Sequence, residues 1–165
     1  MFRIIGLFVK SLFLPKLSMN DNCMLTMRVW PTDMDLNFHM NNAKYLTIGT
    51  IARIWYARRT GLLGQIRKAS CGLVIVGTHI TYHKSLLPFA TYQISTEMIG
   101  ADENWFYFEH KFKKKEKLVA RLVVRMVFIK SGKRLSSEEA KSKLGLSVEN
   151  RLIDLEISKK MDPVT

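Results

Sequence analysis

The spacing of apolar residues changes along the chain from the 3.6-residue period of a helix to the two-residue period of a strand. Residues 43–59 are apolar over much of a helical circumference, which predicts one long helix buried on more than one side. Asn41 or Asn42 can supply its N-cap, and Gly61 can end it in the left-handed conformation. Gly49 lies inside this helix and indicates close packing, because glycine otherwise only weakens a helix.

Two-residue alternation predicts strands on both sides of the helix. A short strand, residues 24–30, precedes the helix and ends before Pro31. Four longer strand candidates follow, separated by turn-like breaks. They are residues 72–84, 89–100, 104–115 and 117–130. After these strands the pattern becomes polar and helical, over residues 136–144 and 148–160.

One long helix beside a run of antiparallel strands indicates an α+β layer architecture. A single sheet wrapped around the apolar helix satisfies the pattern, and other α+β folds satisfy it as well. A length of 165 residues suits one domain with one core. We therefore expect a hydrophobic, basic N-terminal segment over residues 1–16, a domain over 17–135 and a helical extension over 136–165.

The N-terminal segment differs from the rest of the chain. It is nearly all apolar, with Arg3 and Lys10 on one helical face and Pro15 near its end. The apolar run is shorter than the ~20 residues that cross a membrane, and the residues after Pro15 make a poor signal-peptide cleavage site. An amphipathic helix lying in the membrane interface is our leading hypothesis. A helix packed on the domain's own surface is the alternative.

The charge balance narrows the choice of partners. The chain has 26 Lys and Arg against 14 Asp and Glu, a formal charge of +12, which indicates an anionic partner. We expect no nucleic acid, because no recognition module is apparent. Cys23 and Cys71 lack the spacing of metal ligands, and no Gly-rich phosphate loop is present. We therefore predict no metal and no cofactor.

Candidate chemistry lies directly before the long helix. Asp35, Asn37 and His39 are spaced by two, so in an extended segment their side chains project to the same side. The N-terminus of the helix offers unpaired backbone N–H groups that favour negative charge. A carboxylate, an amide and an imidazole near such a site can attack a carbonyl and hold the resulting oxyanion.

Other polar and aromatic residues have simpler interpretations. Asp33 is expected to cap the turn after Pro31. Residues 105–108 form an aromatic run that we expect in the core. Three further histidines fall in strand candidates, and we interpret them as structural. They are His79, His83 and His110.

Residues 33–45, DMDLNFHMNNAKY, resemble the hotdog-fold thioesterases of the 4-hydroxybenzoyl-CoA thioesterase and acyl-carrier-protein thioesterase type. The resemblance covers roughly residues 24–130 and includes residues 60–63 and 105–109. It is strongest to the group called thioesterase superfamily member six and its bacterial relatives. The resemblance implies a hotdog fold, an antiparallel sheet wrapped around a long central helix. It also implies a homodimer or higher assembly, with the long helices together at the dimer interface.

The resemblance also implies roles for individual residues. Asp35 matches the carboxylate that attacks the thioester or activates water, while Asn37 and His39 match the groups that orient water or substrate. Asn42 and Tyr45 match substrate-binding positions, and the backbone N–H near Asn42 would polarise the thioester carbonyl. A thioester suits such a site, because its thiolate leaving group, with a thiol pKa of about 8.5, needs little acid assistance.

One position departs from the family pattern. Ser85 stands where the plant acyl-carrier-protein enzymes carry a further acidic residue. The leading hypothesis that the resemblance implies is hydrolysis of acyl-CoA or acyl-carrier-protein thioesters. We expect a cytoplasmic protein, with a peripheral membrane contact through residues 1–16 if that segment lies in the membrane interface. The alternative is a non-catalytic, acyl-thioester-binding or membrane-associated hotdog protein. Four basic groups are candidates for phosphate contacts. They are Lys84, Arg121, Arg125 and the turn over residues 113–117.

Overall fold

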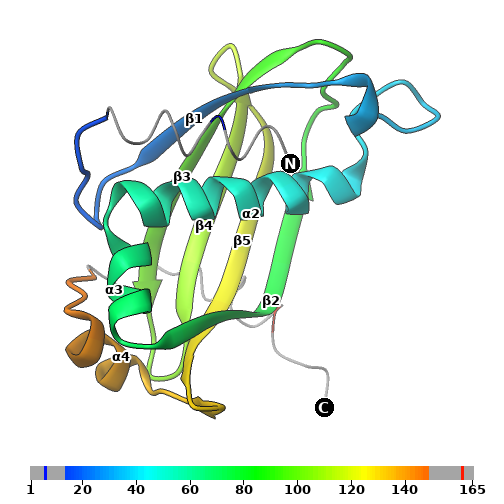
Figure 1. The fold of residues 1–165 in the computed structure, drawn as a ribbon. Helices are drawn as coiled ribbons and strands as arrows, with labels where there is room; N and C mark the ends of the chain where they lie inside the picture. Colours follow the sequence, from blue (N-terminus) through cyan, green and yellow to red (C-terminus); the bar gives the residue numbers. More distant parts are fainter. Residues whose placement is uncertain (1–5, 7–13, 149–160, 162–165) are drawn as a thin grey trace.

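The computed structural model describes residue 6, residues 14–148 and residue 161. Within these residues the chain forms two early helices, a sheet and a later short helix (Figure 1). In chain order the elements are β1 (Cys23–Arg28), the 3-10 turn η1 (Pro31–Asp33), α2 (Asn42–Arg59), α3 (Leu62–Lys68), β2 (Cys71–Tyr82), β3 (Thr91–Ala101), β4 (Phe106–Lys114), β5 (Lys117–Lys130), β6 (Lys133–Arg134) and α4 (Ser137–Leu144).

The strands form one antiparallel sheet in the order β1-β3-β4-β5-β2, with β6 also paired to β5. The sheet curves around α2, which crosses its concave face (Figure 1). The predicted α+β arrangement of one sheet wrapped around a long helix is thus confirmed. The N-terminus of α2 lies close to the end of β2. There the Tyr82 hydroxyl donates to the Asn42 carbonyl at 3.1 Å.

The limits of α2 follow from local chemistry. Asn41 is the N-cap, and its side-chain oxygen accepts a hydrogen bond from the Ala43 N–H at 2.8 Å. Gly61 has a φ of 80°, as predicted, and begins α3 directly after α2. α3 itself was not predicted. The helix predicted over residues 136–144 is confirmed as α4, whereas residues 149–160 lie outside the described part of the chain.

The core lies between α2 and the sheet. Tyr56 on α2 packs edge-to-face on Phe108 of β4, with ring centroids 5.6 Å apart. Gly49 approaches β5 so closely that a Cβ there would lie 2.6 Å from Cδ2 of Leu122. The close packing predicted at Gly49 is therefore confirmed. Three residues of the 105–108 run are buried, and Trp105 is half-buried.

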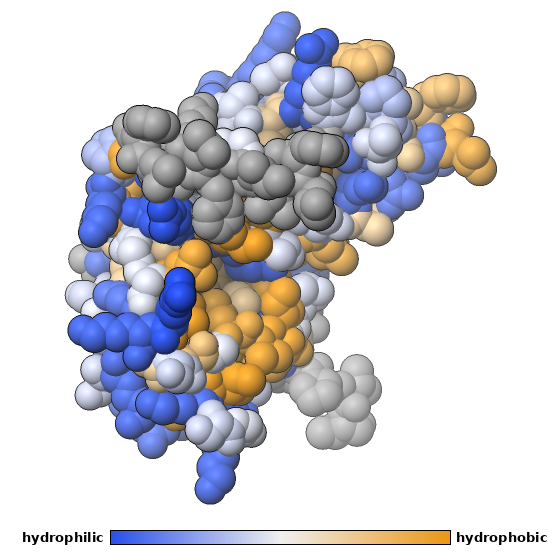
Figure 2. Space-filling model, in the orientation of Figure 1, coloured by the Kyte–Doolittle hydropathy of each residue, from blue (hydrophilic) through white to orange (hydrophobic). Residues whose placement is uncertain are grey.

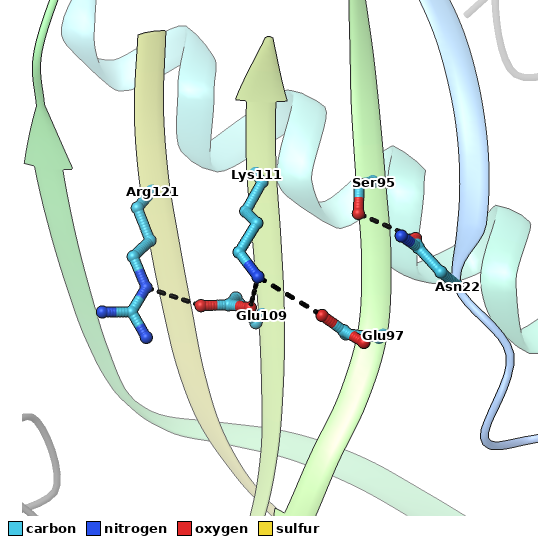
Figure 3. A network of polar contacts seen from close by, with 6 residues as sticks. All are labelled: Asn22, Ser95, Glu97, Glu109, Lys111 and Arg121. Atoms are coloured by element: carbon cyan, nitrogen blue, oxygen red, sulfur yellow. Dashed lines mark hydrogen bonds and ion pairs between the residues drawn. The ribbon is translucent and has the colours of Figure 1, made fainter. Parts of the chain in front are cut away.

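The outer face of the sheet carries a chain of ion pairs (Figure 3). Lys111 lies between Glu97 and Glu109, with nitrogen–oxygen distances of 3.5 and 2.6 Å. Arg121 donates to the other oxygen of Glu109 at 2.5 Å. Arg125 also belongs to this face, where it donates to the Met161 carbonyl and stacks over Trp105. Arg121 and Arg125 thus have partners on the side of the sheet opposite α2.

The membrane hypothesis concerns residues that are mostly not described. Residues 1–5 and 7–13 fall outside the structure, so the membrane contact predicted for residues 1–16 stays a prediction. Among the helices of the described residues, none has the length and apolar character needed to cross a membrane. The predicted cytoplasmic location and the predicted limits of the three chain segments likewise stay predictions.

Candidate functional site

A cavity of about 200 Å³ lies between the start of α2 and the end of β2. Its walls come from the loop before α2, the first turn of α2 and the segment that follows β2. The lining residues are His39, Met40, Asn42, Tyr45, Tyr82, His83, Lys84 and Ser85. Three of the predicted site residues, His39, Asn42 and Tyr45, therefore face one cavity.

The loop before α2 is a closed turn. The Asp35 N–H donates to the His39 carbonyl at 3.0 Å, and the Phe38 N–H donates to the Asp35 carbonyl at 3.1 Å. Phe38 takes a φ of 59°, which is uncommon for a residue other than glycine. The prediction of an extended segment here is therefore wrong. Local backbone bonds fold the segment back on itself.

The turn brings Asp35 and His39 together. Oδ2 of Asp35 lies 3.6 Å from Nδ1 of His39, and both side chains are partly buried. Oδ1 of Asp35 accepts from the Asn37 N–H at 2.9 Å, which leaves Asn37 exposed at the tip of the turn. The imidazole of His39 contributes to the cavity wall, whereas Asp35 is not among the lining residues. Asp35 therefore lies behind His39 and can influence the cavity only by its interaction with the imidazole.

The helix start supplies the polar end of the cavity. Asn41 caps α2, so Asn42 is the first helical residue. Within the described chain, the Asn42 N–H meets no hydrogen-bond acceptor, as expected for the first turn of a helix. The Met40 N–H donates to the Leu86 carbonyl at 2.8 Å and fastens this region to the segment after β2. An oxyanion placed here would meet both an N–H group and the positive end of the helix dipole.

Tyr45 forms the apolar floor of the cavity. It is almost fully buried and packs edge-to-face on Tyr82 and Phe112, with centroids 5.2 and 5.1 Å away. Burial, with a smaller contribution from Tyr82, raises the pKa of Tyr45 to about 12, so its hydroxyl stays protonated at neutral pH. Tyr45 can therefore act in the cavity as a neutral polar group on a rigid aromatic ring.

One histidine of the cavity wall, His83, was not recognised as a site residue from the sequence. β2 ends at Tyr82, and the N–H groups of His83 and Lys84 both donate to the Val119 carbonyl. His83 therefore lies just beyond the end of β2, where it lines the cavity, and its predicted structural role stays a prediction. The signal that could have identified His83 is its position, because it lies near the end of the predicted strand, directly before Ser85 and Lys84, the candidate phosphate contact. Ser85, the departure from the family pattern, also lines the cavity.

Asp33 has a structural role, as expected. It is buried, and its Oδ2 accepts from the Trp30 N–H at 3.0 Å across the 3-10 turn. Its other oxygen lies 3.9 Å from Nζ of Lys44 on α2. Asp33 thereby fixes the loop relative to the helix and is not part of the cavity wall.

Comparisons with known proteins give a family and a fold. A sequence model described as "Thioesterase-like superfamily" matches residues 29–159. Protein THEM6 of Xenopus laevis is 36% identical over 84 residues, which cover 51% of this chain and 41% of that protein. Protein THEM6 of Drosophila melanogaster is 30% identical over 110 residues, 66% of this chain and 57% of that protein. The chain thus spans about half the length of these curated relatives.

Solved structures are similar across most of the fold. YbaW, a probable thioesterase from Escherichia coli, aligns with a TM-score of 0.68 and 21% identity over 73% of this chain and 95% of that one. The Staphylococcus aureus protein SAV2348, solved with CoA, aligns with a TM-score of 0.64 and 18% identity over 91% and 92%. BH1999, a gentisyl-coenzyme A thioesterase, aligns with a TM-score of 0.62 and 18% identity over 75% and 100%. These likenesses confirm the predicted hotdog fold.

Proposed function

Because this chain belongs to the thioesterase-like superfamily, we propose that it hydrolyses acyl thioesters in the cavity at the start of α2. The observation that carries the proposal is the Asp35–His39 pair, which lies beside the N-terminus of a helix and presents an imidazole to that cavity. A base and an oxyanion site are the two groups that thioester hydrolysis needs. Both are supplied here by one short stretch of chain.

The pair supports a water-activation mechanism. Asp35 faces Nδ1 of His39, so Nε2 remains to accept a proton from a water in the cavity. Asp35 would hold the ring in this orientation and stabilise the imidazolium as the hydroxide adds to the thioester carbonyl. The N–H at the start of α2 would stabilise the oxyanion, which then collapses and expels the thiolate. The base role that the resemblance gives Asp35 is thus shared with His39.

The charge around the cavity suits a phosphorylated carrier. Lys84 lines the cavity itself. The turn from Lys113 to Lys117 joins β4 to β5 at the end of the sheet where Val119 pairs with the segment after β2. An acyl-CoA or an acidic acyl carrier protein would meet positive charge at this end.

A second candidate function is acyl-thioester binding without turnover. It is favoured by Ser85, which puts a hydroxyl on the cavity wall where the plant enzymes have an acid. It is also favoured by Asp35, which lies behind His39 rather than on the wall. Both candidates use the same cavity, so they are separated by kinetics rather than by structure.

A thiol-release assay over short, long and aromatic acyl-CoAs tests the proposal. We expect Asp35→Asn and His39→Gln each to lower kcat/KM by about 10²–10⁴, the range that general base catalysis contributes. Asn37→Ala should cost less, because Asn37 lies exposed at the tip of the turn. Glu138→Gln, which changes an exposed carboxylate on α4, is the matched control and should leave kcat/KM unchanged.

Two outcomes would contradict the mechanism. Full turnover by Asp35→Asn and His39→Gln would exclude the pair as the base. Measurable acyl-CoA binding by the wild type without any thiol release would favour the binding function instead.

We also propose that the protein assembles as a homodimer through β2. β2 is an edge of the sheet in the described chain, paired only with β5. Val74, Ile75 and Val76 on this strand are each about 40% exposed, and they form a consecutive apolar run. An apolar edge strand with unpaired backbone groups favours pairing with another chain.

A further inference from the structure

A second cavity lies between α2, α3 and β2, away from the Asp35–His39 pair. Its volume is about 310 Å³, within the usual size of ligand pockets. Figure 2 shows an apolar hollow on this face, below α2. The lining residues are Thr50, Arg53, Ile54, Ala57, Leu62, Leu63, Ile66, Leu73, Ile75, Phe108 and Met126. Arg53 is the charged residue among them.

The guanidinium of Arg53 is buried and held in place. The residue is 8% exposed, and its Nη1 lies 2.9 Å from Nε2 of His110. Its Nη2 donates to Oγ1 of Thr50, also at 2.9 Å. Because a guanidinium can only donate, Nε2 of His110 must accept, and the ring proton lies on Nδ1. Nδ1 then donates to Oγ1 of Thr96 at 2.9 Å.

None of these partners carries a negative charge. Burial, and then the charge of Arg53, lowers the pKa of His110 well below its ordinary value, so the imidazole is neutral. Burial also lowers the pKa of Arg53 to about 10, which leaves the guanidinium charged at neutral pH. In residues 14–148 and 161, no carboxylate forms an ion pair with Arg53. A buried charge without a counter-ion is costly, which points to an anion supplied from outside.

We propose that this cavity binds an apolar chain that ends in a carboxylate, with the carboxylate on Arg53 and the chain against the apolar walls. The hydrogen bonds to His110 and Thr50 leave further guanidinium N–H donors for a carboxylate. Such a ligand matches both properties of the cavity, its apolar lining and its single fixed cation. A neutral chain would leave the guanidinium without a counter-ion.

Two sources supply this chemistry. One is the far end of a dicarboxylic acyl group on a thioester, and this source rests on the proposed function. Arg53 follows Asn42 by eleven residues on α2, or about 16 Å along the helix, so a thioester at the helix start would place its distal end here. The other source is a free fatty acid, which needs no hydrolysis at the first cavity.

Titration calorimetry on the full chain tests the proposal. We expect decanoic acid, or the CoA thioester of decanedioic acid measured in an Asp35→Ala background, to bind at least tenfold more tightly than its counterpart. The counterparts, whose chains end in an uncharged group, are decanol and decanoyl-CoA. Arg53→Met should abolish the preference, and Arg53→Lys should keep part of it. Arg58→Met removes an exposed arginine from the same helix and should keep all of it.

The arms of the experiment separate the sources and the alternatives. A preference only among the CoA thioesters identifies the dicarboxylic acyl group, and a preference only among the free chains identifies the fatty acid. Equal binding of the acidic chains and their counterparts by the protein that retains Arg53, wild type for the free chains and Asp35→Ala for the CoA thioesters, overturns the proposal, whether or not the Arg53 variants fold. The same result is expected if a second copy of the chain fills the cavity, because neither kind of ligand could then enter it. Calorimetry measures binding and does not require turnover. Failure of the thiol-release assay would therefore count against the proposed hydrolysis and not against the carboxylate site at Arg53.

Discussion

At the scale of single residues, Glu109 shows how a carboxylate stays ionised while almost fully buried. Burial alone would raise its pKa, but hydrogen bonds and ion pairs with Lys111 and Arg121 outweigh burial, and the pKa lies below its ordinary value. Those two cations are themselves partly exposed on the outer face of the sheet. Through Arg121, Glu109 links β4 to β5, and Lys111 extends the network in Figure 3 to Glu97 on β3.

Acid should weaken the fold through Glu109. Because its pKa is depressed in the folded state, its stabilising contribution is complete above the ordinary value of 4.5 and is lost as the pH falls through the lower folded value. Glu109→Gln should lower the free energy of unfolding by about 1–3 kcal/mol at pH 7, less than for a fully buried pair. Below the folded pKa the difference between variant and wild type should shrink. Urea denaturation of both proteins, at pH 7 and at a pH below the folded pKa of Glu109, measures this difference.

An exposed carboxylate gives the control for this prediction. Glu116 is 83% exposed and lies 3.9 Å from Lys113 in the turn between β4 and β5. Glu116→Gln should change the free energy of unfolding by less than about 0.5 kcal/mol at either pH. If Glu109→Gln behaved like Glu116→Gln, the ion-pair network would contribute nothing to stability.

The sequence identified most of the candidate site but not its local geometry. Asp35, His39, Asn42 and Tyr45 were selected by spacing and by resemblance, and three of them line one cavity. The extended segment failed as a prediction because Asp35 makes several local bonds and Phe38 adopts a positive φ. Such turns form through a few short-range hydrogen bonds. A two-residue spacing of polar residues cannot predict these bonds.

At the scale of whole elements, α2 and β5 are in close contact where Gly49 packs against Leu122. Gly49→Ala should lower the free energy of unfolding by about 1 kcal/mol. Displacing Leu122 costs about 1–3 kcal/mol, and the better helix propensity of alanine returns up to about 1 kcal/mol. Thermal or urea denaturation at pH 7 measures the change.

A second glycine provides the matched control. A Cβ at Gly64 in α3 would meet nothing within 4 Å. Gly64→Ala should therefore stabilise the protein by about 0.5–1 kcal/mol, since only backbone entropy and helix propensity change. Equal stabilisation by both substitutions would show that Leu122 moves aside without cost.

Periodicity located the long elements well and missed the short helix α3. All five predicted strands are present, and the strand over residues 117–130 has the predicted ends. α3 has seven residues, two helical turns that are too short to establish a 3.6-residue pattern. Its start instead depends on Gly61, whose left-handed conformation was predicted without the helix that follows. Sequence patterns thus need several repeats before they specify an element.

At the scale of the whole molecule, the proposed dimer can be tested at the two edges of the sheet. Val74→Lys combined with Val76→Lys places charges on the apolar run of β2 and should give single chains of 19.1 kDa by light scattering. The wild type should give about twice that mass. Met24→Lys changes a residue of β1 that is 45% exposed and should leave the dimer intact. A single-chain mass for the wild type would contradict the dimer.

The strand order also determines when the protein can fold during its synthesis. α2 is complete at Arg59, yet the central strands that it packs against come later, and β5, with Leu122 against Gly49, ends at Lys130. At ~5–20 residues per second, the ribosome needs on the order of ten seconds to cover this interval. For that time the apolar side of α2 has no sheet to cover it, so the nascent chain is a natural client for a chaperone.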